Sequence, residues 1–182
     1  LYDFNDGARV LLPEGKWHVR LLDADSGNIL FCCDINNGWV TSSKKYFVRF
    51  RIQVFRQGED TPLLDETLNL TDRDVLISFP TGTLGDLLGW FPYAERFQSL
   101  HQCRLECTMA QDIIDLLAPQ YPQICFSTPE KPRTTEPYAT YRVGLYFGGD
   151  TNNQPVDFRQ VVFQRSAGYS LGGAPREAPV RL

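Results

Sequence analysis

The chain has 182 residues, of which 42% are hydrophobic, and its net charge is -4 at pH 7. This hydrophobic content supports a packed core rather than a disordered chain, and the acidic balance argues against a nucleic-acid-binding protein, which normally has a basic face. No apolar run is long enough to span a membrane, and the N-terminus lacks the basic start and apolar block of a signal peptide. We therefore expect a globular protein with one ordinary domain or two small ones.

Alternating apolar and polar residues predict an all-β module over residues 1–72. The clearest alternation runs from Tyr46 to Val54, where every second side chain is apolar. The expected strands cover residues 10–12, 17–21, 29–33, 46–54 and 63–68. Short strands joined by tight turns are typical of a small barrel or sandwich. Because such a small module buries little surface by itself, we expect it to dock on a neighbour or to oligomerise.

A Rossmann-like half-domain is predicted for residues 73–182, so the whole chain is of the α+β class. An apolar run at 75–79 predicts a strand, and apolar residues at helical spacing from Leu84 onward predict a helix. Pro92 within this helix predicts a kink or a short first segment. Further strands are expected at 103–107, 124–126 and 141–147, and further helices at 109–117 and 158–169. Strands that alternate with helices form a mostly parallel sheet.

Two glycine-bearing loops follow expected strands of this half-domain, and ligands of such sheets bind beyond the carboxyl ends of the strands. Glycines let a ligand approach the backbone closely, and the free N–H groups of a helix start bind anions. The candidate substrate-binding residues are Thr81, Gly82, Thr83 and Gly85 in the first loop and Gly148, Gly149 and Asp150 in the second. Asp86, at the helix start, is the candidate base for a hydroxyl nucleophile.

These carboxylates also have an ordinary structural interpretation. An aspartate at a helix start, such as Asp86, commonly caps the helix or faces its dipole. Asp150 and Asn152 have the composition of a turn. His18 and His101 have no nucleophile near them in sequence, so a Ser-His-Asp triad has no support.

The cysteines do not predict a metal site in this chain. An odd count, an adjacent pair and a sizeable core suit a reducing compartment better than a disulfide framework. Cys103 and Cys107 are four residues apart, but they lie in a segment with a strand pattern, and no histidine or second cysteine pair follows at a zinc spacing. The remaining cysteines are Cys32, Cys33 and Cys125.

A family resemblance gives Asp86 a chemical role. The run GTLGDLLGWFPYA at 82–94 resembles the opening loop and helix of bacterial heptosyltransferases, with a Gly-Asp pair, two apolar residues and a proline one turn later. In those GT-B glycosyltransferases the aspartate after the glycine is taken as the catalytic base. The resemblance therefore implies that Asp86 is a base, and it accounts for Pro92.

Three further segments resemble the bacterial autotransporter heptosyltransferases: YDFNDGAR at 2–9, FPTGTLGD at 79–86 and FGGD at 147–150. The resemblance covers nearly the whole chain. It implies transfer of heptose from ADP-heptose to serines of an autotransporter in the bacterial cytoplasm. It also implies a ring-shaped homo-oligomer, a dodecamer, and an iron ion held by four cysteines in a later part of the family sequence. We assign none of the cysteines of this chain to that site.

A GT-B enzyme has two Rossmann-like domains, and the C-terminal one normally holds most of the nucleotide sugar. We expect this second domain to be missing from the 182 residues, so the chain alone is expected to be inactive. Two alternatives stay open. One is a glycosyltransferase that uses a different sugar or acceptor, and the other is a non-catalytic module that binds a protein.

Overall fold

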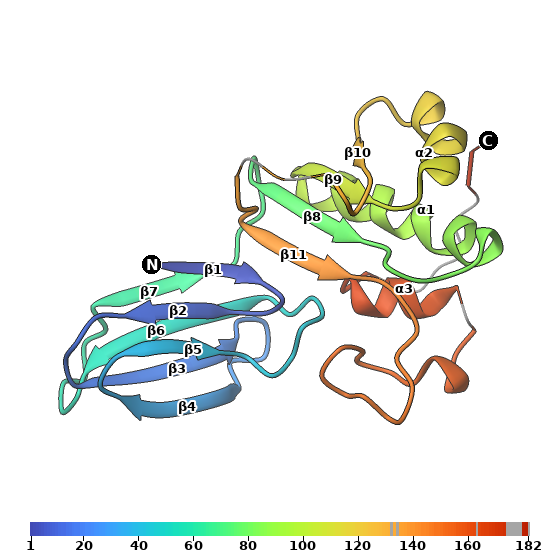
Figure 1. Cartoon of the computed structure of the whole chain (residues 1–182). Coiled ribbons are helices and arrows are strands. Elements are labelled where there is room, and N and C mark those ends of the chain that lie inside the picture. The colour runs from blue at the N-terminus through green and yellow to red at the C-terminus, as the bar shows by residue number, and fades with distance from the viewer. Residues whose placement is uncertain (132, 134, 163, 174–179, 182) are drawn as a thin grey trace.

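The computed structural model describes residues 1–131, 133, 135–162, 164–173 and 180–181 as a mixed α/β chain with two sheets (Figure 1). One sheet has the strand order β10-β9-β8-β11-β1-β2-β5 and the other the order β4-β3-β6-β7. Within the described residues no helix has the length and apolarity that crossing a membrane requires.

The strands are β1 (Tyr2–Asn5), β2 (Arg9–Leu12), β3 (Trp17–Asp23), β4 (Ile29–Ile35), β5 (Gly38–Thr41), β6 (Phe50–Arg56), β7 (Leu64–Thr67), β8 (Asp74–Ser78), β9 (Arg104–Thr108), β10 (Cys125–Ser127) and β11 (Ala139–Arg142). The helices are α1 (Leu84–His101), α2 (Gln111–Leu117) and α3 (Arg165–Ser170), with short 3-10 turns at Ala118–Gln120 and Phe158–Gln160.

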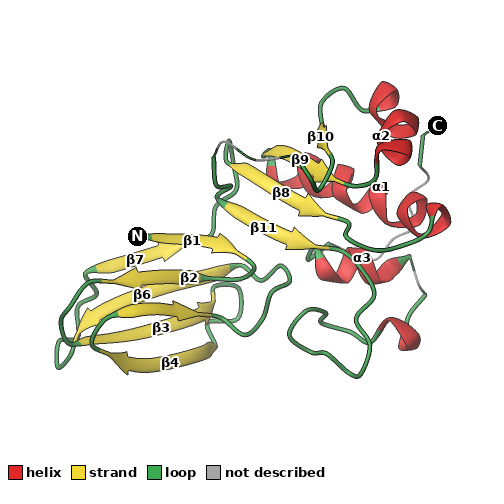
Figure 2. Ribbon diagram, viewed as in Figure 1, coloured by secondary structure: helices red, strands yellow, loops and turns green. Residues whose placement is uncertain are grey.

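The β module has two sheet layers and is not a closed barrel, so of the two expected forms the barrel is wrong and the sandwich describes the module better (Figure 2). Buried side chains of both layers, such as Val10 and Val40 on one side and Val19 and Ile52 on the other, belong to one core. The reason that the barrel stays open lies in β1. It pairs with β2 on one side and runs parallel to β11 on the other, so its second edge joins the α/β part instead of closing the module.

Two strands of the module, β1 and β5, were not predicted, and β6 is shorter than predicted. It starts at Phe50, whereas alternation predicted a strand from Tyr46. The segment before it turns away because the N–H of Phe47 donates to the carbonyl of Ser170, 2.9 Å away, at the end of α3. The alternation of apolar residues therefore starts before the strand does, because its first residues lie against α3 instead of in the sheet.

The α/β part has four neighbouring parallel strands with α1 and α2 in the connections, as predicted. Helix α1 runs as one element through Pro92, so the short first segment that the proline suggested does not form. A proline in a helix removes one backbone hydrogen bond, and here the ring is buried among apolar side chains of α1 such as Phe91 and Ala94.

The last predicted strand and helix are both shorter than expected. Strand β11 ends at Arg142 and not at Phe147. Beyond it the chain leaves the sheet, and the carbonyl of Tyr146 accepts instead from the side-chain amide of Gln154 at 2.8 Å. The helix expected at 158–169 is a 3-10 turn at its start and α3 at its end, and residue 163 lies outside the described residues.

A buried hydrogen-bond network fastens β1 to β11. Asn5, which is 6% exposed, accepts from the hydroxyl of Thr140 at 2.7 Å and donates to the carbonyl of Pro137 at 2.8 Å. Buried polar groups of this kind cost free energy when a partner is removed. The junction between the two parts therefore contains directed hydrogen bonds as well as apolar contacts.

We expect Asn5→Ala to lower the free energy of unfolding by about 1–3 kcal/mol, because it leaves the Thr140 hydroxyl and a backbone carbonyl buried without their partner. Urea unfolding measures the change. The control is Asn37→Ala at an exposed turn position. A loss no larger than that of the control contradicts the role of the network.

A second junction joins the connection before β6 to the end of α1. The ring of Phe47 lies 5.7 Å from that of Phe97 and 4.9 Å from that of His101, between ring centroids. Burial lowers the pKa of His101. A Cβ on Gly172 would lie 2.1 Å from the Phe47 ring, so the backbone of the α3 end packs directly on this cluster.

The lowered pKa of His101 predicts a pH-dependent stability. The unfolded chain binds a proton near pH 6.5 while the folded chain resists it, so stability falls as the pH drops below about 6.5. We expect His101→Gln to flatten this part of the profile, which thermal unfolding between pH 5 and pH 8 records. An unchanged slope in the variant contradicts the assignment.

Candidate active site

The loops after β8 and β11 begin side by side. These two strands are parallel neighbours, and Ser78, the last residue of β8, is the register partner of Arg142, the last residue of β11. The N–H of Val143 extends the pairing by donating to the carbonyl of Ser78 at 2.9 Å. One step further, a Cβ on Gly144 would lie 3.0 Å from Oγ1 of Thr81. The two loops therefore touch at Thr81 and Gly144.

Asp86 is fixed at the start of α1 by a reciprocal cap. Its Oδ2 accepts from the backbone N–H of Thr83 at 2.7 Å, and the Thr83 side chain accepts from the backbone of the third helical residue, which is Asp86 itself. The side chain of Asp86 is half-buried. A carboxylate has about four lone-pair sites, so the cap uses only part of what Asp86 can accept. The structural interpretation of Asp86 as a cap is correct, and it leaves room for a chemical role.

Gly82 is required by both conformation and space. Its φ is +128°, a value that side chains rarely allow. A Cβ here would lie 3.0 Å from the ring of Trp90 and 3.2 Å from Cβ of Asp86. Trp90 is fully buried under the loop. The backbone of the loop therefore lies directly against the buried Trp90 ring beside Asp86, and this contact fixes the position of the carboxylate.

The second predicted loop is a separate turn. Gly148 and Gly149 have φ of +76° and +73° with open space around them. Asp150 accepts from the side-chain and backbone N–H groups of Asn153, which hold the pKa of its carboxyl below the ordinary value. The carbonyl of Asn152 accepts from the N–H of Lys45 at 2.8 Å, which ties this turn to the β module.

The structure thus brings Thr81, Gly82, Thr83, Gly85 and Asp86 together at one helix start, with Gly144 against them. Sequence reasoning missed Gly144, because it expected a strand through Phe147. The contact between Thr81 and the backbone of a neighbouring strand end has no signal in a single sequence. The capping box does have a signal in a single sequence, since a threonine followed three residues later by an acidic residue is its usual pattern.

The burial of the cysteines bears on the iron that the resemblance implies. Cys103 and Cys107 are buried, whereas Cys32 and Cys125 are exposed. Burial raises the pKa of Cys103 to about 11, which disfavours the thiolate that a metal needs. No group of three or more His, Cys, Asp or Glu side chains that could hold a metal occurs in the part of the chain that the structure describes. Among the residues that the structure describes, the side chains therefore do not fit an iron site.

Gly82 and Gly85 provide a matched test of the loop. Gly82→Ala should lower the free energy of unfolding by about 1–3 kcal/mol, because a side chain is strained at this φ and meets Trp90. Gly85→Ala should keep or raise stability by about 0.5–1 kcal/mol, because alanine favours a helix and its Cβ would make only an ordinary contact, 3.9 Å from Oγ1 of Thr83. Urea unfolding compares the two variants. Equal stabilities would show that the loop is not held as described.

Comparison with known proteins finds a similarity to glycosyltransferases. Residues 1–58 match the family model described as glycosyltransferase TibC, N-terminal domain. The chain is 97% identical over 182 residues to the autotransporter heptosyltransferase BAHTCr of Citrobacter rodentium, and 89% identical over 181 residues to the autotransporter heptosyltransferase TibC of Escherichia coli O78:H11. It is also 44% identical to BimC of Burkholderia thailandensis, which is named an inactive autotransporter heptosyltransferase.

Solved structures agree with these relationships. The chain matches the crystal structure of the iron-containing dodecameric glycosyltransferase TibC with a TM-score of 0.96 at 88% identity. The same protein, TibC, has been solved in complex with ADP-D-beta-D-heptose. The match covers the whole of this chain, but the chain spans only 44–45% of the first two relatives and 48% of the TibC structure. Over all 182 residues, in sequence and in fold, the chain therefore matches autotransporter heptosyltransferases, along a stretch that includes their N-terminal domain.

Proposed function

We propose that this chain is the acceptor-side part of a glycosyltransferase that moves heptose from ADP-heptose to serine hydroxyls of an autotransporter, with Asp86 as the catalytic base. One observation carries the proposal. A half-buried carboxylate is held at the start of α1, at the carboxyl edge of the parallel strands, where the loops after β8 and β11 meet. Ligands of such sheets bind at this edge. The solved complex of TibC with ADP-D-beta-D-heptose supports the choice of donor.

The reaction is a single displacement. Asp86 accepts the proton of the serine hydroxyl, and the serine oxygen forms a bond to the anomeric carbon of the heptose. The bond between that carbon and the terminal phosphate oxygen of ADP breaks at the same time, and its electron pair leaves with ADP. Attack from the face opposite the leaving group inverts the anomeric configuration.

The helix cap suggests which part of the site binds each substrate group. A helix start attracts anions, but the Asp86 carboxylate already lies in the first turn of α1 and repels a second negative charge. We therefore assign the sugar and the acceptor to the loop formed by Thr81, Gly82, Thr83 and Gly85. The relatives are more than twice as long as this chain, and we assign the diphosphate chiefly to a C-terminal Rossmann-like domain of the complete protein.

The other expectations for the complete protein remain proposals. They are a division at residue 72, assembly into a ring of identical subunits, an iron ion held outside these residues and a cytoplasmic location. The dodecameric and iron-containing TibC supports the assembly and the iron. A substrate-binding role for Gly148, Gly149 and Asp150 also remains a prediction, because their turn accounts for the hydrogen bonds of Asp150 without a substrate.

A non-catalytic function is the second candidate. BimC shares 44% identity over all 182 residues and is named inactive, so this fold alone does not guarantee transfer. In that case the module would bind a protein partner while the α/β part serves as its support.

Asp86→Asn in the complete protein separates these functions. The amide oxygen can still accept from the Thr83 N–H, so the helix cap and the fold persist, but the group no longer accepts a proton. We expect loss of transfer by at least about a hundredfold, the usual contribution of a general base. Intact mass of the co-expressed autotransporter, with and without a heptose residue per site, measures the transfer.

Asp112→Asn is the matched control, because Asp112 lies in the first turn of the neighbouring helix α2. It should leave transfer unchanged. Normal glycosylation by Asp86→Asn would refute the assignment of the base. An unmodified autotransporter with the unaltered protein would favour the binding module, and an added mass other than heptose would favour another donor.

A further inference from the structure

Strand β1 of the β module ends at the same edge of the sheet as β8 and β11. It runs parallel to β11, with Asn5 beside Thr140, and β11 runs parallel to β8, with Thr140 beside Leu76. Figure 1 shows the three strands side by side with their arrowheads in one direction. Leu76, Thr140 and Asn5 therefore form a row across one face of the sheet. The row lies two residues, about 7 Å, before the strand end at Ser78 that leads to the candidate site.

A cavity of about 370 Å³ lies over this row, and none of the described residues that line it belongs to a helix. We call it the junction cavity, and its lining includes Asn5, Asp6, Arg9, Leu76, Thr140 and Arg142. Helix α1 covers the opposite face, where Phe97 packs against Tyr141 with 5.4 Å between ring centroids. Parallel sheets are normally covered on both faces. The junction cavity is thus a part of the sheet that is open to a ligand, and its volume is typical of a small-molecule site.

The charges around the junction cavity are paired. Among the described residues that line it there are three guanidinium groups, and each forms an ion pair with a carboxylate: Arg9 with Asp3, Arg133 with Glu106 and Arg142 with Asp6. Glu136 adds a further carboxylate to the lining. An anion would be repelled by the carboxylates and a cation by the guanidinium groups. The junction cavity therefore favours a ligand that is polar but uncharged.

The pair of Asp6 and Arg142 offers donors and acceptors side by side. Nε and Nη2 of Arg142 donate to Oδ1 and Oδ2 of Asp6 at 3.0 and 2.9 Å. A carboxylate has about four lone-pair sites and a guanidinium group has five N–H groups, so roughly half of each remains available to a ligand. A sugar hydroxyl both donates and accepts, and two neighbouring hydroxyls match such a pair. Leu76 and Pro137 add apolar surface for the C–H groups of a sugar ring.

The turn that carries Asp6 is held in place before a ligand binds. Asp6 and Gly7 have φ of +54° and +96°. A Cβ on Gly7 would lie 2.3 Å from the carbonyl oxygen of Lys44, so the backbone of the turn packs directly on the segment after β5. A binding group that is fixed in advance loses less conformational entropy when its ligand binds.

We propose that the junction cavity binds a heptose residue that is already attached to the autotransporter, while Asp86 acts on a further serine of the same acceptor. The inference rests on the proposed function, which supplies the sugar, and it adds a second sugar site that the β module and the α/β part form together. The floor of the cavity lies close to the strand ends of the candidate site, so one acceptor chain can reach both. The donor heptose is the other source of the same chemistry.

Binding of methyl heptoside to the complete protein tests the site, with saturation-transfer NMR as the measurement. ADP-heptose at saturating concentration fills the donor site, and the Asp86→Asn variant prevents turnover. We expect the methyl heptoside to bind under these conditions. A serine peptide of the autotransporter that carries one heptose should displace it, and the same peptide without heptose should not.

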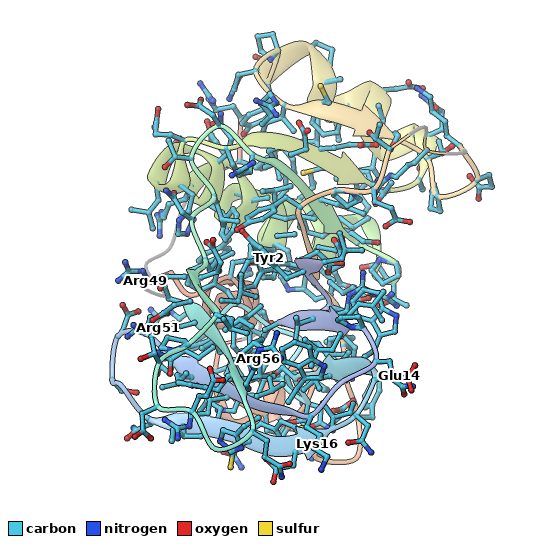
Figure 3. All side chains as sticks on the ribbon, turned by 90° about the vertical axis from the view of Figure 1, so that its left-hand side faces the viewer. Tyr2, Glu14, Lys16, Arg49, Arg51 and Arg56 are labelled. Atoms are coloured by element: carbon cyan, nitrogen blue, oxygen red, sulfur yellow. The ribbon has the colours of Figure 1, made fainter. Side chains whose placement is uncertain are left out.

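Substitution of the paired arginines locates the site. Arg142→Gln and Arg9→Gln should each weaken the methyl heptoside at least about tenfold, because each removes charged hydrogen-bond donors. Arg51→Gln is the matched control. Arg51 lies on β6, on the flank of the β module (Figure 3), and donates to Asp65 through two bonds of 2.6 Å. Its side chain is 43% exposed, compared with 55% for Arg142. Thermal unfolding shows that the variants fold.

The outcomes separate the sugar site from the proposed function. Absence of methyl heptoside binding, its displacement by ADP-heptose, or equal affinity in all three glutamine variants would overturn the junction cavity as a sugar site. Displacement by the peptide without heptose would also overturn it, since the cavity would then bind polypeptide. Failure of the proposed function has a different sign, because it would appear as normal transfer by Asp86→Asn, whatever the affinity for the methyl heptoside.

Discussion

The parallel pairing of β11 is the constraint on which the rest of the structure depends. On one side β11 pairs with β1 and joins the β module to the α/β part, and on the other it pairs with β8. The same four-residue strand therefore keeps the module open and places Gly144 against Thr81. One strand thus fastens the module through β1 and shapes the candidate site through β8. The buried hydrogen bond between Thr140 and Asn5 belongs to the first of these pairings.

At the helix start, structure and chemistry use the same group. Asp86 holds the first turn of α1 through Thr83, and the buried ring of Trp90 holds the loop that leads into it. A base must be positioned before its pKa can serve catalysis. Here the position is set by a backbone hydrogen bond and by a glycine that no other residue can replace without strain. The local rigidity that a cap provides is what a general base requires.

Local sequence patterns predicted those elements that are determined by residues close together in the chain. The helix start at Leu84, the capping aspartate and the alternation of parallel strands and helices follow from spacing and residue type. The sequence could not decide between a barrel and a sandwich, because β1 depends on a strand more than a hundred residues away. The false strand before Phe50 arose because Phe47 bonds to α3 rather than to a neighbouring strand. A catalytic role for Asp86 came from family resemblance, since spacing alone describes a cap equally well.

The account is tested most directly by the structure of the complete protein with an unreactive ADP-heptose analogue and a serine peptide of the autotransporter. The proposed mechanism predicts a carboxylate oxygen of Asp86 within about 2.6–3.2 Å of the serine hydroxyl, while Oδ2 keeps its bond to the Thr83 N–H. The serine oxygen should face the anomeric carbon on the side opposite ADP. A serine that is bound beside another carboxylate, with Asp86 serving only as the cap of α1, would contradict it.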